Sequence, residues 1–260
     1  MNENLPEMER QIESYQGKLL PVLAKGPGVC GVCHSWSLPS YNTCMTCHLG
    51  LKSIPTSADA IGFVSLAVRR ESLANELWRY KDAVSEVERD RLSKELTALL
   101  WRWLLQHESC VERTAGVDGF PVVTSIPSTK NRTAHPLETI VKSTIPLTRH
   151  RYRALLQPAP GHGDDRKYSS DRFIARDVEP GQPVLVVDDT FTTGSRIQGA
   201  ASALKAAGSG PVGAIVIGRH FRFDNLKDDF AEAAHRYLLR SRALNWDWDA
   251  CCLCDGRRMN

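Results

Sequence analysis

The feature that most restricts the fold of this chain is a strand–loop–helix–strand pattern over residues 183–220. Residues 184–187 are consecutively apolar, which is typical of a strand buried on both faces of a parallel sheet. A helical pattern over 195–207 follows and ends at Gly208, a residue type that commonly lies just past a helix end. Residues 212–217 form a second buried apolar run. This order predicts a βαβ unit, and therefore an α/β fold with a parallel sheet flanked by helices.

The loop after the first of these strands has the composition of an anion site. It consists of Thr190, Phe191, Thr192, Thr193, Gly194, Ser195 and Arg196. Hydroxyls and backbone N–H groups at a helix amino terminus favour a phosphate dianion, and open α/β sheets bind ligands at the carboxyl ends of their strands. The preceding Asp188 and Asp189 suit a ligand with a diol or a divalent metal beside its phosphate. Ribose 5-phosphate meets both requirements, whereas two capping aspartates at a strand end are the alternative interpretation.

Four cysteines near the amino terminus form two C-x-x-C pairs: Cys30, Cys33, Cys44 and Cys47. Zinc prefers four soft ligands at tetrahedral corners, and each C-x-x-C turn presents two thiolates to one ion. The segment has few apolar residues, so metal binding would have to supply its folding free energy. The spacing predicts a structural Zn²⁺ site, with a redox-active C-x-x-C as the alternative. We expect His34 and His48 to lie outside the ligand set, because four cysteines complete it.

Composition places the chain among ordinary globular proteins. Its 260 residues are 42% hydrophobic and 24% charged, which argues against a disordered chain and allows one or two domains. The first twenty residues lack the apolar core of a signal peptide, and no window approaches the ~20 apolar residues that span a bilayer. We therefore expect a cytoplasmic protein without a membrane segment, in which cysteines are metal ligands or free thiols rather than disulfides.

A second group of cysteines near the end of the chain has a role that the sequence leaves open. Cys251, Cys252 and Cys254 could help bind a second ion, pack against the first cysteine module, or remain free. Their spacing fits no standard ligand pattern. Cys110 would bring the number to four, but it lies in a separate segment and on its own is expected to be a small buried residue.

Two amphipathic stretches lie between the first cysteine group and the βαβ unit. Residues 70–81 place Leu73, Leu77 and Tyr80 at helical spacing, and Ser85 with Glu88 forms a capping box before a second helix. That second helix has a broad apolar face consisting of Leu92, Leu96, Leu99, Leu100, Trp103 and Leu104. We divide the chain into a zinc-binding module (1–55), connecting helices packed on the core (56–115), an α/β domain (116–245) and a cysteine-containing tail (246–260).

The stretch VLVVDDTFTTG resembles the phosphoribosyl pyrophosphate (PRPP) loop of type I phosphoribosyltransferases. The resemblance implies that Asp188 and Asp189 bind the ribose hydroxyls, that residues 190–195 wrap the 5-phosphate, and that Mg²⁺ bridges the pyrophosphate and the ribose. A four-cysteine module, a LANELWRYKD-like segment and this loop, in that order, are similar to the ComF family. ComF-like proteins pair an amino-terminal zinc module with a phosphoribosyltransferase-like domain and are linked to DNA uptake or DNA metabolism. The loop departs from the family pattern at Arg196, where threonine is usual, and at Thr190, where an apolar residue is commoner.

The same resemblance places the pyrophosphate loop after the first strand of the α/β domain. We expect that strand at residues 122–127, followed by the polar and basic loop Ser128, Thr129 and Lys130, although such loops are as often merely solvated. The stretch 154–173 is rich in proline and glycine and then basic, and we expect a mobile flap there. Phe221, after the last strand, is a candidate for stacking on an acceptor ring.

Two functions are compatible with these expectations. As an enzyme, the protein would displace pyrophosphate from C1 of PRPP with an unknown acceptor, through a transition state resembling an oxocarbenium ion, with Asp188 and Asp189 as catalytic residues. As a non-catalytic accessory protein of ComF type, it would bind PRPP, a nucleotide or DNA, and the zinc module would contact DNA or a protein partner. The lack of an identifiable acceptor-base pocket favours the second function, and the presence of both aspartates with the TTG turn favours the first.

Overall fold

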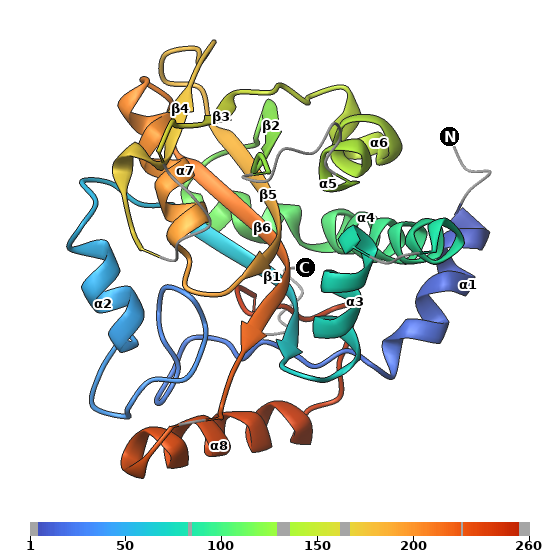
Figure 1. Ribbon diagram of the computed structural model, residues 1–260, viewed down its shortest axis with the longest axis vertical. Coiled ribbons are helices and arrows are strands. Elements are labelled where there is room, and N and C mark those ends of the chain that lie inside the picture. The colour runs from blue at the N-terminus through green and yellow to red at the C-terminus, as the bar shows by residue number, and fades with distance from the viewer. Residues whose placement is uncertain (1–4, 83–84, 129–135, 162–166, 225, 255–260) are drawn as a thin grey trace.

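The computed structural model describes residues 5–82, 85–128, 136–161, 167–224 and 226–254. Its centre is a sheet of four parallel strands in the order β1-β6-β5-β2 (Figure 1). These strands are β1 (Ala60–Val68), β6 (Val212–Phe221), β5 (Val184–Phe191) and β2 (Val122–Ser125). The α/β fold with a parallel sheet flanked by helices is confirmed, and the apolar runs predicted at 184–187 and 212–217 are its two central strands.

The register of the sheet places the end of β2 beside the middle of β5, directly before the predicted site residue Asp188. In β5, Val187 pairs with Ser125 of β2 on one side and with Ile215 of β6 on the other. The backbone N–H of Ile126 donates to the carbonyl of Val187 at 3.1 Å. Because all the strands are parallel, the residues that follow β2 and β5 emerge at the same edge of the sheet. This edge is where the sequence predicts the ligand.

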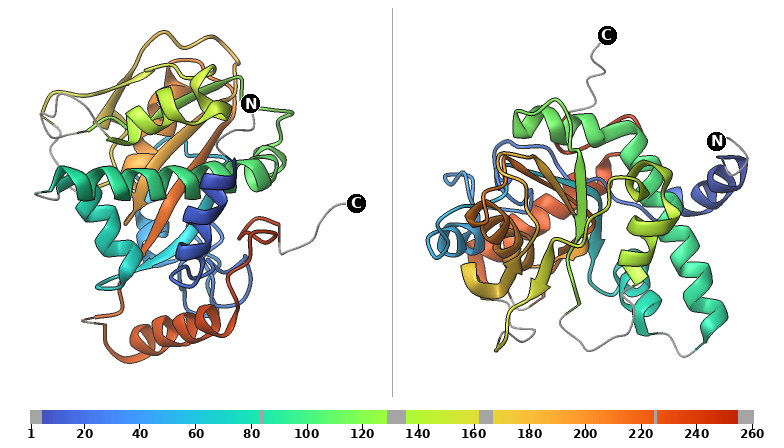
Figure 2. Two further views of the ribbon diagram at one scale, coloured as in Figure 1. Left: turned by 90° about the vertical axis from the view of Figure 1, so that its right-hand side faces the viewer. Right: turned by 90° about the horizontal axis from the view of Figure 1, so that it is seen from above.

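Helices cover both faces of the sheet (Figures 1 and 2). One face packs against α3 (Ser72–Asp82) and α4 (Glu86–Ala115), with α1 (Leu5–Gln16) behind α4. The other face packs against α7 (Ser195–Ala206), α8 (Asp228–Ala243) and the cysteine module, which includes α2 (Met45–Leu51). Each central strand is buried on both sides, as its unbroken apolar sequence predicts.

The long helix α4 forms as its sequence predicts. The Ser85 hydroxyl caps its first turn by accepting the N–H of Glu88 at 3.4 Å. The helix ends at Gly116, whose left-handed backbone (φ 72°) allows its N–H to bond back to carbonyls of the last turn. All six residues of the predicted apolar face are buried, as are Leu73, Leu77 and Tyr80 of α3.

Segment 56–115, predicted to consist of connecting helices, also contains strand β1 of the central sheet. This segment contains α3 and α4, but it begins with a buried nine-residue strand that pairs with β6. Its sequence is apolar apart from Gly62 and Ser65, and such a run has no period that separates a buried strand from a buried helix. A Cβ at Gly62 would lie 2.4 Å from the Trp103 ring, so glycine is required for α4 to pack this closely on the strand. The sheet therefore draws on the chain before residue 116 as well as after it.

The stretch expected to be a mobile flap is partly built into the fold. Its ends form the antiparallel pair β3 (Leu156–Pro158) and β4 (Phe173–Ala175). A 3₁₀ turn at Ser170–Arg172 packs against α7, and Arg172 is buried. Residues 162–166 lie outside the described part of the chain.

Short helices complete the described chain: α5 (Pro136–Thr139), a π-helical turn (Ile140–Thr144) and α6 (Pro146–Arg149). In the part of the chain that the structure describes, none of the helices combines the length and the apolar character needed to cross a membrane.

Candidate functional site

A pocket of about 230 Å³ opens at the carboxyl end of β5. It is lined by the continuous run of residues 188–197 and by Lys81, which reaches it from the last turn of α3. All nine site residues predicted at Asp188–Arg196 therefore border one cavity. Lys81 was not among the predicted site residues.

The loop between β5 and α7 turns sharply at Gly194. This residue has φ 94°, and a Cβ placed there would lie 2.3 Å from the Phe191 ring. The turn is braced by the Thr193 hydroxyl, which lies 3.3 Å from the Ser195 hydroxyl and accepts the N–H of Ser195 at 3.4 Å. The loop thus presents the amino terminus of a twelve-residue helix to the pocket, with its backbone N–H groups and partial positive charge.

Asp188 lies at the floor of the pocket and is 3% exposed. Its Oδ1 accepts the N–H of Asp189 at 3.0 Å, and Nε of Arg196 lies 3.9 Å from its Oδ2. Burial raises the pKa of Asp188 to about 6, and the Arg196 charge opposes that rise only in part. This carboxyl group therefore changes its charge just below neutral pH.

Asp189 is equally buried but firmly paired. Nζ of Lys81 lies 2.5 Å from its Oδ2, and the Tyr80 hydroxyl donates to the same oxygen. Burial alone would raise the pKa of Asp189, but Lys81 and Tyr80 together lower it to about 2. In turn, burial and the Asp189 charge raise the pKa of Tyr80 well above its usual value. Two adjacent carboxyl groups thus have widely separated pKa values, a pattern typical of functional sites.

Tyr80 and Lys81 are site residues that the sequence pattern does not predict. Tyr80 was expected only as a core residue, and its ring is indeed buried while its hydroxyl reaches Asp189. A lysine in the last turn of an amphipathic helix is ordinarily a solvated residue that favours the helix dipole. The available signal was the LANELWRYKD-like segment, which carried a family resemblance but no residue role.

Arg196 links the pocket to the neighbouring strand. Its Nη2 donates to the carbonyl of Pro127 at 2.9 Å, just beyond the end of β2. The predicted pyrophosphate loop thus begins beside the predicted phosphate loop. Of its residues, Ser128 belongs to the described chain, whereas Thr129 and Lys130 lie outside it.

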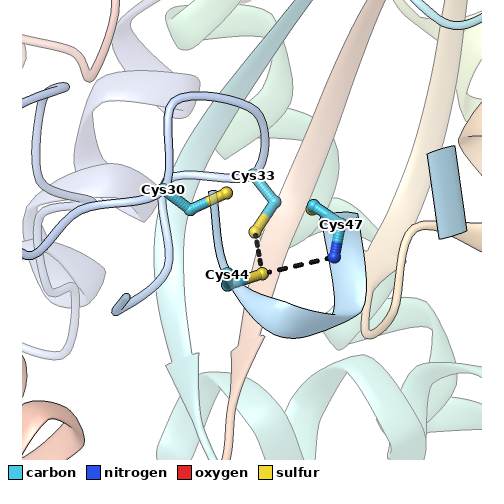
Figure 3. A group of neighbouring side chains, drawn as sticks. All are labelled: Cys30, Cys33, Cys44 and Cys47. Atoms are coloured by element: carbon cyan, nitrogen blue, oxygen red, sulfur yellow. Dashed lines mark hydrogen bonds between the residues drawn. The ribbon is translucent and has the colours of Figure 1, made fainter. Parts of the chain in front are cut away.

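The four amino-terminal cysteines come together as predicted (Figure 3). The sulfurs of Cys30, Cys33, Cys44 and Cys47 all lie within 4.8 Å of one another. Cys33 Sγ and Cys44 Sγ are 3.7 Å apart, close to the ~3.8 Å expected between sulfurs on a tetrahedron with Zn–S bonds of about 2.3 Å. These sulfurs could hold a metal ion such as zinc. His34 bonds through Nδ1 to the Leu23 carbonyl and His48 is exposed, so both lie outside the group.

Buried Arg219 connects the cysteine group to the pocket loop. On one side, its Nε donates to the Cys33 carbonyl at 2.9 Å and its Nη2 lies 3.3 Å from Cys33 Sγ. On the other side, its Nη1 donates to the carbonyls of Phe191 and Thr192 at 3.1 and 3.2 Å. The neighbouring thiols lower the pKa of Cys33 well below its usual value, and the Arg219 charge adds to this effect. The sequence alone indicates no role for Arg219, because its partners are distant along the chain.

Two aromatic residues near the pocket have their rings in the core. Phe191 is 1% exposed and packs edge-on against Phe63, so it contributes its backbone rather than its ring to the loop. Phe221 is equally buried and stacks on Tyr237 of α8 at 5.3 Å. The expectation that Phe221 stacks on an acceptor ring is therefore wrong. Its side chain points to the face of the sheet covered by α8.

No protein-family model matches this chain, and no curated protein matches it either.

Proposed function

We propose that this protein binds PRPP, or a related phosphoribosyl ligand, together with Mg²⁺ in the pocket at the end of β5, as a phosphoribosyltransferase-like protein of ComF type. The observation that carries the proposal is the juxtaposition of a buried carboxylate pair with a hydroxyl-rich turn at a helix amino terminus, in one pocket at the carboxyl end of a parallel strand. A phosphate and a diol on one small ligand would satisfy both halves of this pocket.

The residues of the pocket divide into two groups by charge. The turn Thr192–Ser195 would hold the 5-phosphate through hydroxyl and backbone N–H groups. Because Lys81 is paired with Asp189, less positive charge lies beside the Asp188 carboxylate. Asp188 would therefore accept hydrogen bonds from the ribose hydroxyls. Asp189 would hold Lys81 at the edge of the pocket, where the ammonium can face the ligand's phosphates.

Mg²⁺ bound with the ligand would neutralise part of the negative charge of the pyrophosphate. The carboxylate oxygens of Asp188 are donors of the kind that Mg²⁺ prefers. Arg196 and Lys81 would add positive charge beside the same group. In the transfer, the bond from C1 to the pyrophosphate oxygen breaks, a bond from C1 to the acceptor forms, and the acceptor loses its proton. The chain's contribution is to orient the ligand and to stabilise the developing charge on the leaving group.

The cysteine group would hold one structural Zn²⁺. Its sulfurs are packed in the hydrophobic core, beside β6 and the pocket loop. A zinc ion with four thiolates carries a net negative charge, and Arg219 lies where it would offset part of that charge. Zinc would thereby fix Arg219, and Arg219 would fix the carbonyls of the pocket loop.

Calorimetric titration of PRPP with Mg²⁺ into the zinc-loaded protein tests the proposal. We expect saturable binding that is lost in the Asp188→Asn/Asp189→Asn variant. Asp59→Asn is a matched control, since Asp59 bonds Lys205 and the N–H of Val212 at the opposite, amino-terminal edge of the sheet. Absence of binding by folded wild type, or equal binding by the double variant, would refute the proposal. Pyrophosphate release that depends on an added acceptor separates the enzyme from the non-catalytic binding protein.

A further inference from the structure

The tail after α8 runs back to the carboxyl-terminal half of α4. Both views of Figure 2 place the red tail beside the green end of this helix. The indole of Trp246 donates to the Val64 carbonyl at 3.3 Å, and the Trp248 ring packs edge-on against the Trp246 ring at 4.3 Å. Arg102 of α4 lies over the Trp248 ring at 5.9 Å. These contacts hold the tail against the hydrophobic core and bring its cysteines to α4.

Four potential metal ligands meet at this junction: His107, Cys110, Cys251 and Cys254. The ligating atoms all lie within 4.8 Å of one another. Cys110 Sγ and Cys254 Sγ lie 3.7 and 3.9 Å from His107 Nδ1, and Cys251 Sγ lies 3.3 Å from Cys254 Sγ. His107 and Cys110 are buried, and the two tail cysteines are half-buried.

The local geometry of each pair suits chelation. His107 and Cys110 are three residues apart on one helix, so their side chains lie on the same face. Cys251 and Cys254 form a C-x-x-C turn in which the Cys251 N–H donates to Cys254 Sγ at 3.3 Å. The amino-terminal cysteine group also has an N–H to sulfur contact within a C-x-x-C turn, but in the opposite sense, from the N–H of the later Cys47 to Sγ of the earlier Cys44.

The hydrogen bond on the far side of His107 orients it as a ligand. Its Nε2 lies 2.8 Å from the Trp248 carbonyl, which can only accept, so Nε2 carries the proton. Nδ1 therefore carries no proton, and its lone pair is directed at the three sulfurs. A backbone carbonyl that fixes the histidine tautomer in this way is one of the usual outer partners of a metal-bound imidazole.

We propose a second zinc site in this protein, formed by His107, Cys110, Cys251 and Cys254. Three sulfurs and one imidazole are a standard tetrahedral set for structural zinc. On binding, the three thiols release their protons to solvent and zinc takes one bond from each ligand. Two ligands come from α4 and two from the tail, so the ion clamps the end of the chain to the helix that covers the sheet. Cys252 stands outside the site, because its side chain is buried in the core cluster on the other face.

Metal analysis of the purified protein tests this proposal. Wild type should contain two zinc ions per chain, and Cys251→Ser/Cys254→Ser should contain one. Cys252→Ser is the matched control, because it removes a thiol from the same tail outside the site, and it should keep both ions. A wild type with one zinc ion that the double variant retains would overturn the proposal. A Cys251–Cys254 disulfide in protein isolated without exposure to air would also overturn it.

A spectroscopic measurement on wild type keeps the test independent of how the variants fold. Protein loaded with ¹¹³Cd should give two cadmium resonances, one from four sulfurs and a more shielded one from three sulfurs and a nitrogen. Coupling of the second resonance to ¹⁵N-labelled His107 Nδ1 is the expected signature. A single resonance, or a second one without coupling to histidine, would contradict the assignment.

Discussion

Removal of Lys81 tests whether the pocket depends on a charged cluster assembled between α3 and β5. Lys81→Met keeps most of the side-chain volume and removes the ammonium that lies 2.5 Å from Asp189 Oδ2. Two buried, adjacent carboxyl groups then share Arg196, which is 3.9 Å from Asp188, and the Tyr80 hydroxyl. Because burial alone raises the pKa of Asp189, this pKa should move from about 2 to above its usual value.

The expected loss of stability follows from this pKa. A pKa of about 2 for Asp189 in the folded protein, against its ordinary value of 3.8, contributes about 2.5 kcal/mol to the free energy of unfolding at neutral pH. Leaving the carboxylate buried without its partner increases the cost, so we expect a loss of about 3–5 kcal/mol in the free energy of unfolding at pH 7.5.

The sign of the pH dependence separates this account from a simple packing defect. A lowered native pKa stabilises the protein above pH ~4 and stops doing so as pH falls through about 2. In the variant, Asp189 takes up a proton on acidification, so the deficit relative to wild type should shrink between pH 7.5 and pH 5.

Urea unfolding of the zinc-loaded proteins at these two pH values measures the effect. Lys205→Met is the matched control, because Lys205 pairs with Asp59 at 2.8 Å but Asp59 is 33% exposed in its side chain. We expect that control to lose about 1 kcal/mol or less. A Lys81→Met deficit of similar size, or one that is the same at both pH values, would refute the reasoning.

Three further predictions concern the pocket and its support. Asp188→Asn should abolish ligand binding yet stabilise the protein by about 3 kcal/mol at pH 8. The reason is that the pKa of the Asp188 carboxyl group is raised to about 6, so this group costs stability as pH rises through that value. If urea unfolding shows that the variant's gain in stability persists unchanged below pH 4, this reasoning is contradicted. Gly194→Ala should lower stability by about 1–3 kcal/mol, because the left-handed backbone and the Phe191 ring both oppose a Cβ, and an unchanged melting temperature would count against this geometry. Arg219→Met should speed zinc transfer to a chromogenic chelator, since the guanidinium contacts Cys33 Sγ at 3.3 Å; an unaltered transfer rate would show that this contact does not hold the metal.

The local parts of this structure are predictable from the sequence. The C-x-x-C spacing identifies Cys30, Cys33, Cys44 and Cys47 as one group, because two short turns fix the positions of four sulfurs. The βαβ pattern likewise predicts β5, α7 and β6, including the end of β5 and the turn after it at residues 188–195, which line the pocket. In both cases the residues that meet are close together along the chain.

The parts that were missed depend on contacts between distant segments. Lys81 reaches Asp189 only because α3 packs on the sheet, and Arg219 reaches Cys33 across 186 residues. His107 is an unremarkable histidine within a helix until the tail, more than 140 residues later, brings Cys251 and Cys254 beside it. Periodicity and spacing carry no information about such pairs.

An NMR titration of the isotope-labelled, zinc-loaded protein with ribose 5-phosphate and Mg²⁺ tests the central claim most directly. This ligand has the phosphate and the diol that the pocket is proposed to recognise. The account predicts that the largest amide shifts occur at Thr193, Gly194 and Ser195, and that they disappear in the Asp188→Asn/Asp189→Asn variant. No shifts at saturating ligand, or shifts centred on another part of the molecule, would contradict it.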